Sequence, residues 1–248
     1  MKMEENKPDF STRAYLLPHI NPEGWKFGLV ALAVACALLF ASRWAPCLDC
    51  LGWLFLLLAW GVFLFFRDPE RYPPEDERAI LSPADGRICL VQECELPDSF
   101  GEMDEYKGKK FWRVSVFMSV FNVHVNRMPT AGEILKKEYV AAGRFFNASL
   151  DKASKENERC NYLVKSECGR VYAVTQIAGL VARRIVPQVS EGDRKGRAER
   201  FGLIRFGSRL DVYLPEGVEP AVRPGQTMVA GETPLAWLPA AGDAGAKS

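Results

Sequence analysis

The chain has little net charge, few histidines and no clustered cysteines, and each shortage excludes a class of function. Its 248 residues carry a formal net charge of +1, which does not favour a nucleic-acid partner. Seven cysteines are scattered along the chain and do not form a disulfide framework. Cys47 and Cys50 make a CxxC pair, but no second pair or histidine cluster lies near them in the sequence to complete a zinc site. We therefore expect no metal and interpret the pair as incidental loop cysteines.

Charge is also missing from two apolar runs near the N-terminus, residues 27–42 and 51–66. Each run is about 16 residues long, slightly under the roughly 20 of a full span. Trp25 and Trp44 flank the first run like an aromatic belt. The alternatives are a buried hairpin of a soluble core and a signal peptide, but two adjacent uncharged runs without an Ala-x-Ala-like site disfavour both. We predict a helical membrane hairpin over residues 26–66 that either spans or re-enters the bilayer.

Basic residues predict the orientation of this hairpin. They are concentrated before and after it, at Lys2, Lys7, Arg13, Lys26, Arg67, Arg71 and Arg78. The connector between the two runs holds only Arg43. By the positive-inside tendency, both ends of the hairpin and the whole C-terminal domain face the cytoplasm from the cell membrane.

The chain after the hairpin predicts a mainly β (α+β) domain over residues 67–239. Short runs with period-two alternation, typical of half-buried strands, are separated by Gly, Pro and Asp turns. They include residues 87–91, 113–117, 170–174 and 209–213. Residues 147–158 are the most helix-like part of this domain. Residues 1–25 are expected to form an irregular lead-in and residues 240–248 a disordered tail.

Two glycine-rich segments of this domain, residues 191–201 and 224–232, resemble the hairpins of lipoyl or biotinyl carrier folds. Asp151-Lys152-Ala153 also matches the tripeptide that carries lipoyl groups. In a carrier, that lysine must lie at an exposed hairpin tip. Because Lys152 is flanked by a charged, helix-like stretch, a solvated surface lysine is the better interpretation.

The dipeptide Gly207-Ser208 lies between two strand-like runs and offers a nucleophile. A serine hydroxyl is weakly nucleophilic and needs a base, usually a histidine oriented by a carboxylate. Of the two histidines, His19 precedes the hairpin, whereas His124 lies in the strand-like segment 121–129. Taken alone, His124 is most simply a satisfied core or surface side chain, and Asp85 in Ser82-Pro83-Ala84-Asp85-Gly86 most simply a turn residue.

Several motifs together change both interpretations, because their order and spacing are far more specific than any one of them. They are Phe65-Phe66-Arg67-Asp68-Pro69-Glu70-Arg71, Ser82-Pro83-Ala84-Asp85-Gly86, Asn122-Val123-His124-Val125-Asn126-Arg127, Asn147-Ala148-Ser149-Leu150-Asp151-Lys152-Ala153-Ser154, Glu156-Asn157-Glu158-Arg159 and Phe206-Gly207-Ser208-Arg209. They resemble the signatures of the phosphatidylserine decarboxylase family, in its short, membrane-anchored form. The resemblance covers nearly the whole chain after the lead-in.

The resemblance implies a self-cleaving enzyme that makes its own pyruvoyl cofactor from Ser208. Asp85 would orient His124, which takes the Ser208 proton, and cleavage after Gly207 would leave a β chain, 1–207, and an α chain, 208–248. The pyruvoyl group would form a Schiff base with phosphatidylserine and release CO2, giving phosphatidylethanolamine. His124 would then return a proton, since histidine ordinarily titrates near neutrality. The implied partners are the phospholipid substrate, the membrane and a second αβ unit in a dimer.

One departure from the family bears on these roles. Long-form members carry two histidines close together and a Leu-Gly-Ser-Thr cleavage motif. This chain has one histidine there, with Arg127 nearby, and reads Phe-Gly-Ser-Arg. Roles that long-form members divide between two histidines must therefore fall on His124, on other groups or on water.

Two other functional classes compete with this interpretation. A membrane-bound Ser-His-Asp lipid esterase would use the same three residues but keep its serine, and the G-x-S-x-G elbow is absent around Ser208. A non-enzymatic, membrane-tethered β module would explain the anchor but not the His124 and Gly-Ser segments. Self-cleavage separates the three, because only the decarboxylase requires it.

Overall fold

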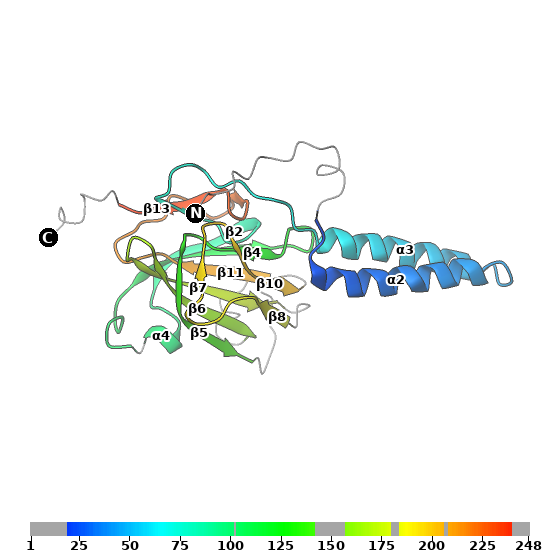
Figure 1. The fold of residues 1–248 in the computed structure, drawn as a ribbon, viewed down its shortest axis with the longest axis horizontal. Helices are drawn as coiled ribbons and strands as arrows, with labels where there is room; N and C mark the ends of the chain where they lie inside the picture. Colours follow the sequence, from blue (N-terminus) through cyan, green and yellow to red (C-terminus); the bar gives the residue numbers. More distant parts are fainter. Residues whose placement is uncertain (1–18, 102, 142–156, 180–183, 206–207, 240–248) are drawn as a thin grey trace, which may run out of the picture. The chain divides into compact units, whose positions relative to one another are not determined.

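The computed structural model describes residues 19–101, 103–141, 157–179, 184–205 and 208–239. Contacts divide the chain into two compact units, Met1–Glu70 and Arg71–Ser248. The described part of the first unit is a hairpin of two helices, α2 (Pro22–Ala41) and α3 (Leu48–Phe65), shown in blue and cyan in Figure 1. The apolar runs of the sequence therefore form a helical hairpin, as predicted.

The base of the hairpin is closed by local hydrogen bonds. The side chain of Asn21 caps α2 by accepting a hydrogen bond from Glu23 N at 3.1 Å, and Pro22 follows at a position where helices tolerate proline. An antiparallel bridge joins Ile20 to Arg67, and Asn21 N donates to the Phe66 carbonyl at 2.8 Å. The chain therefore enters and leaves the hairpin at the same point.

The outward surface of the two helices is strongly apolar. Both helices are long and apolar enough to cross a membrane. Trp25, Val30, Trp53 and Trp60 each expose about half or more of their surface, at 48%, 65%, 59% and 63%. Large exposed apolar patches of this kind mark a surface that contacts a membrane or another protein. The helices thus support membrane association.

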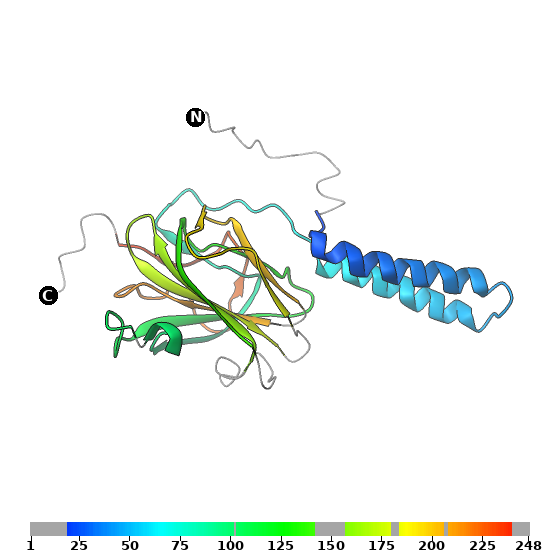
Figure 2. The same cartoon turned by 60° about the horizontal axis from the view of Figure 1, so that its bottom comes forward.

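The second unit is built on an eight-stranded sheet in the order β12-β2-β3-β11-β7-β6-β5-β9. All of its strand pairs are antiparallel. Its strands are β2 (Gly86–Cys94), β3 (Phe111–Met118), β5 (Gly132–Val140), β6 (Arg159–Ser166), β7 (Val171–Ala178), β9 (Arg194–Lys195), β11 (Ser208–Tyr213) and β12 (Thr227–Met228). Figure 2 shows how strongly these strands curve around the interior.

Two smaller sheets and one short helix complete the unit. The three-stranded sheet has the order β4-β10-β8, and β1 pairs with β13. These elements are β1 (Ala79–Leu81), α4 (Asp98–Gly101), β4 (Val125–Arg127), β8 (Arg184–Pro187), β10 (Arg200–Arg205) and β13 (Pro234–Trp237). The mainly β (α+β) fold class with an N-terminal helical hairpin is confirmed.

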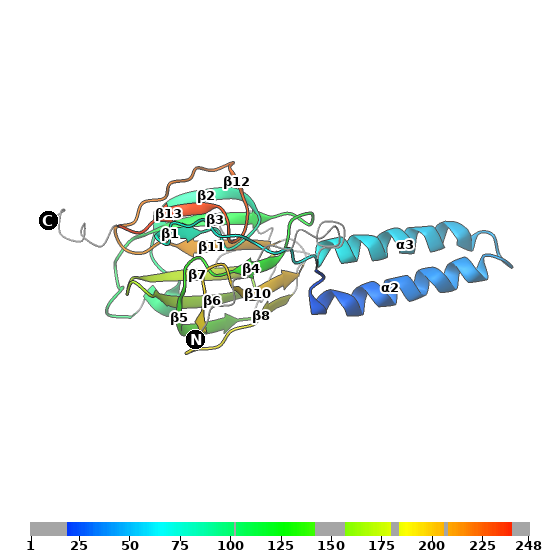
Figure 3. The same cartoon turned by 45° about the horizontal axis from the view of Figure 1, so that its top comes forward.

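Strand β11 occupies the centre of the large sheet, between β3 and β7 (Figure 3). Side chains alternate across a strand, so its two faces differ. Leu210 and Val212 belong to the main apolar core, whereas Tyr213 packs in a second cluster with Phe100 and Phe111 on the other face. The sheet is therefore buried on both sides at β11, and every residue of this strand is buried.

The predicted strands fall on observed ones with two qualifications. Residues 87–91, 113–117 and 209–213 lie within β2, β3 and β11, and residues 170–174 overlap β7, which begins at Val171. The segment 121–129 contains only the short strand β4, and His124 directly precedes it. The helix-like stretch 147–158 lies outside the described residues except for Asn157 and Glu158.

Gly86 is expected to be essential for the start of β2. Its φ is +153°, and a Cβ built there would lie 2.1 Å from the Phe117 carbonyl oxygen. A Gly86→Ala chain should lose about 2–4 kcal/mol of unfolding free energy, since neither the backbone conformation nor the space admits a side chain. Thermal unfolding measures the loss. Gly196→Ala is the matched control, because the nearest atom to its added Cβ would be Glu199 Oε2 at 3.5 Å.

Candidate active site

Ser208 is the first residue of β11 and is fully buried. It pairs with Met118 on β3 and with Ala178 on β7. Its hydroxyl lies 3.9 Å from the Met118 sulfur, which is a weak hydrogen-bond acceptor. The hydroxyl is thus placed against a soft apolar contact on the core face of the sheet, which leaves it available to a stronger base.

A buried ion pair lies on the face of β11 opposite Ser208. Arg209 Nε and Asp211 Oδ1 lie 2.7 Å apart, and both side chains are completely buried. Burial alone would lower the pKa of the Arg209 guanidinium, but the charge and hydrogen bonds of Asp211 outweigh it and raise that pKa. Both residues belong to β11, and breaking their buried pair would leave an uncompensated charge inside the sheet.

His124 is also fully buried. Its Nδ1 lies 2.9 Å from the Asn122 carbonyl oxygen. A carbonyl can only accept a hydrogen bond, so Nδ1 carries a proton and, in the neutral ring, Nε2 holds the basic lone pair. The Ile204 N–H donates to the His124 carbonyl at 3.3 Å, which ties this residue to β10, the strand that precedes the cleavage segment.

The Asp85 carboxylate is held by a cation and a backbone amide. Its two oxygens lie 3.0 and 2.8 Å from Arg71 Nη2, and Oδ1 accepts a hydrogen bond from Ala230 N at 2.8 Å. The Arg71 and Asp85 side chains expose only 13% and 14% of their surface. These partners hold the carboxylate in one orientation through charge-assisted hydrogen bonds.

The Asp85 and His124 segments run side by side. Leu81 N donates to the Pro129 carbonyl and Arg127 N to the Pro83 carbonyl, each at 2.9 Å. If this antiparallel spacing continues, Asp85 lies opposite the residue that follows His124. The described hydrogen bonds of Asp85 are nevertheless those to Arg71 and Ala230, so an Asp85–His124 hydrogen bond stays a prediction. Gly207 lies outside the described residues.

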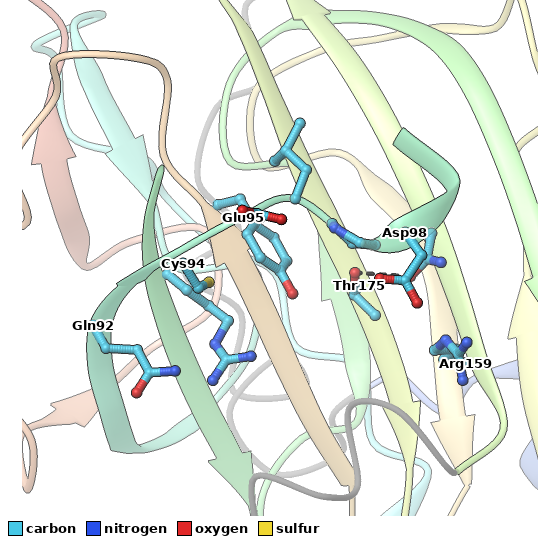
Figure 4. Close-up of a pocket in the computed structure, with 11 residues that line it drawn as sticks. Gln92, Cys94, Glu95, Asp98, Arg159 and Thr175 are labelled. Carbon is cyan, nitrogen blue, oxygen red and sulfur yellow. Dashed lines mark hydrogen bonds between the residues drawn. The ribbon is translucent and has the colours of Figure 1, made fainter. Parts of the chain in front are cut away.

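A cavity of about 350 Å³ lies on the face of the sheet opposite Ser208. Figure 4 shows Gln92 and Cys94 on one side of it and Thr175 and Arg159 on the other. It is lined by neither Ser208, His124 nor Asp85. Because Tyr213, at the far end of β11 from Ser208, belongs to its wall, this cavity is separate from the candidate active site.

Sequence reasoning missed two residues of this site. In the sequence, Arg71 is one of the basic residues that predict the orientation of the hairpin and the last residue of a motif, yet in the structure it binds Asp85. Asn126 was noted only as part of a motif, although it is fully buried two residues after His124. A polar residue at that spacing on a predicted strand shares a face with the histidine, and this signal could have identified it. No comparable pattern in the sequence connects Arg71 with Asp85.

Most of the chain is similar to proteins of one known family. The family model described as "Phosphatidylserine decarboxylase" matches residues 58–236, a span that includes Asp85, His124, Gly207 and Ser208. A "Phosphatidylserine decarboxylase proenzyme" of Erythrobacter litoralis is 51% identical over 224 residues, covering 88% of each chain. One from Ruegeria pomeroyi is 51% identical over 226 residues, 91% of this chain and 98% of its own. One from Zymomonas mobilis is 44% identical over 241 residues, 96% of this chain and 95% of its own.

Proposed function

This chain belongs to the phosphatidylserine decarboxylase family, and from that premise we propose that it cleaves itself between Gly207 and Ser208 to become a phosphatidylserine decarboxylase. The observation that carries the proposal is the position of Ser208. It is a buried serine at the first position of the central strand, directly after the segment where the precursor would be cut. The buried His124 lies on the segment that pairs with the strand before that cut.

Self-cleavage begins with the Ser208 hydroxyl. Its oxygen attacks the Gly207 carbonyl carbon, while Nε2 of His124 accepts the hydroxyl proton, and the amide becomes an ester. Removal of the proton on the α-carbon of residue 208 then expels the Gly207 carboxylate and leaves dehydroalanine. Its imine tautomer adds water and releases ammonia, so residue 208 becomes a pyruvoyl group. The serine is therefore consumed once and not regenerated, in contrast to a hydrolase.

Asp85 contributes a fixed negative charge beside the histidine segment. Arg71 and the Ala230 amide hold its carboxylate in one orientation, so the charge needs no rearrangement during the reaction. In that position it can orient His124 or stabilise the imidazolium that forms when the ring accepts the Ser208 proton.

The pyruvoyl group, once present, supplies an electrophilic carbonyl for the substrate amine and an electron sink for the loss of CO2. The residues around position 208 fit such a group. Ser208 is fully buried beside Met118, so a ketone formed there is shielded from bulk water and from competing nucleophiles. His124 can then return the proton to the α-carbon of the product.

The membrane hairpin brings the enzyme to its substrate. A diacyl lipid leaves the bilayer only at a cost of about 0.8 kcal/mol per exposed CH2, so the enzyme must act at the interface. Basic residues flank the hairpin on both sides, which supports a catalytic domain, residues 67–239, on the cytoplasmic face of the cell membrane. We further expect the mature enzyme to associate as a dimer of αβ units.

The test is the mass of the protein purified in detergent from fresh cells. We expect two polypeptides, the first ending at Gly207 and the second beginning at residue 208 with a blocked, ketone-containing N-terminus. The preparation should also convert phosphatidylserine vesicles to phosphatidylethanolamine and CO2. A single chain with intact Ser208 would contradict the proposal, and ester hydrolysis by that chain would favour the esterase.

A further inference from the structure

A chain of four buried side chains leads from the sheet interior to Ser208. Tyr162 Oη donates to Gln176 Oε1 at 2.7 Å, and Gln176 Nε2 donates to Asn126 Oδ1 at 2.8 Å. Asn126 Nδ2 then donates to the Met118 sulfur at 3.7 Å, the same sulfur that the Ser208 hydroxyl contacts at 3.9 Å. All five residues expose 1% of their surface or less.

The hydrogen bonds of this series all run in one direction, from Tyr162 towards Met118. Burial raises the pKa of the Tyr162 phenol above its usual value, so the hydroxyl keeps its proton and acts as the first donor. The Gln176 amide accepts from Tyr162 through Oε1 and donates to Asn126 through Nε2, since an amide oxygen only accepts and an amide NH2 only donates. The amide of Asn126 is thereby oriented in turn, with its NH2 directed at the Met118 sulfur.

The surrounding backbone leaves room for this arrangement. Gly202 on β10 pairs with Asn126, and a Cβ built at Gly202 would lie 2.7 Å from Gln176 Nε2. The ring of Tyr162 packs edge-on against Phe201 with 5.4 Å between their centroids, which restricts its rotation. A buried polar network that is fully satisfied specifies one arrangement of its members.

We propose that Asn126 is a positioning residue for self-cleavage, oriented by Tyr162 and Gln176. It acts through Met118: its NH2 holds the thioether in the place where the sulfur accepts the Ser208 hydroxyl, and so it sets the rotamer from which Ser208 attacks. The proposal rests on the proposed self-cleavage and adds the residues that make the serine ready for it. Because a thioether is a weak acceptor, it orients the hydroxyl without competing with His124 for the proton.

The experiment compares two buried tyrosines on neighbouring strands. Tyr162→Phe removes the first hydrogen-bond donor of this series of side chains. Tyr172→Phe removes a hydroxyl that accepts from Thr130 at 3.2 Å and, among the described residues, makes no hydrogen bond to that series. Precursor made by cell-free synthesis with lipid vesicles is followed by gel as it cleaves. We expect Tyr162→Phe to slow cleavage about tenfold, because the Gln176 and Asn126 amides are then no longer held in the orientation that places the Met118 sulfur. We expect Tyr172→Phe to change the rate by less than about twofold.

A second variant identifies the step. Asn126→Asp still accepts from Gln176 but has no NH2 for Met118, so its cleavage should also slow at least about tenfold. Hydroxylamine, which cuts esters, should release no excess fragment from either slowed variant, because the attack by Ser208 is the delayed step. Ester that accumulates would contradict the proposal, as would wild-type rates or an equal slowing of both tyrosine variants. If the wild-type chain itself did not cleave, the proposed function would fail instead.

Discussion

A Ser208→Ala chain is expected to remain a single polypeptide of about 27.8 kDa and to have no decarboxylase activity. Alanine lacks the hydroxyl that attacks the Gly207 carbonyl, and without that attack there is neither ester nor pyruvoyl group. The loss should be complete, since removing this side chain removes both the nucleophile and the precursor of the cofactor. Denaturing gels and intact mass measure cleavage, and release of labelled CO2 from phosphatidylserine measures activity.

Ser115→Ala is the matched control for this prediction. Ser115 is a fully buried serine on β3, the strand next to β11, and its hydroxyl has no hydrogen-bond partner among the described residues. Loss of its Oγ should therefore change neither cleavage nor activity. Cleavage of the Ser208→Ala chain at the same bond would show that another group starts the reaction and would overturn the assigned nucleophile.

The two products of wild-type cleavage should stay together until they are denatured. The α chain would contribute β11, which is hydrogen-bonded to β3 and β7 of the β chain on either side. Its β12 and β13 pair with β2 and β1, and its Ala230 amide binds Asp85. The proposed cut would remove one peptide bond but none of these contacts, so the mature site would be made of both chains.

Much of this fold follows from local pattern. Uncharged apolar runs predicted the helical hairpin, because only helices satisfy their backbone groups in such segments. Period-two alternation predicted β2, β3 and β11, because these strands place alternate side chains on different faces. The sequence did not reveal that β11 lies between β3 and β7, since strand order depends on contacts between segments far apart in the chain.

The candidate site, like the fold, could be predicted from the sequence only in part. Gly207-Ser208, His124 and Asp85 were selected by motif, and the described residues place Ser208 and His124 in fully buried positions. The partners of Asp85 could not be predicted. Arg71 is 14 residues away and the Ala230 amide is 145 residues away, and their approach depends on the packing of turns from both ends of the domain. Backbone amides in particular carry no side-chain signal in a sequence.

A His124→Gln chain is expected to cleave itself at least about 100-fold more slowly than the wild type, since positioned acid–base groups contribute about 10²–10⁴ to a rate. Glutamine can still donate to the Asn122 carbonyl, as Nδ1 of His124 does. It has no nitrogen that can accept the Ser208 proton. The variant therefore removes the proton acceptor but keeps the hydrogen bond to the Asn122 carbonyl. Time courses of cleavage in cell-free synthesis measure the effect.

The chain contains its own control, because His19 is its only other histidine. His19 is exposed, and its carbonyl accepts a hydrogen bond from Asp68 N at the base of the hairpin, a contact that survives any change of side chain. His19→Gln should therefore cleave at the wild-type rate. Should His124→Gln cleave and decarboxylate as fast as His19→Gln, both roles of His124 would be excluded, and the proton would have to pass to water or to another group near Ser208. If only the decarboxylation step were slowed, the histidine would act on the lipid substrate alone, and the base for Ser208 would remain to be found.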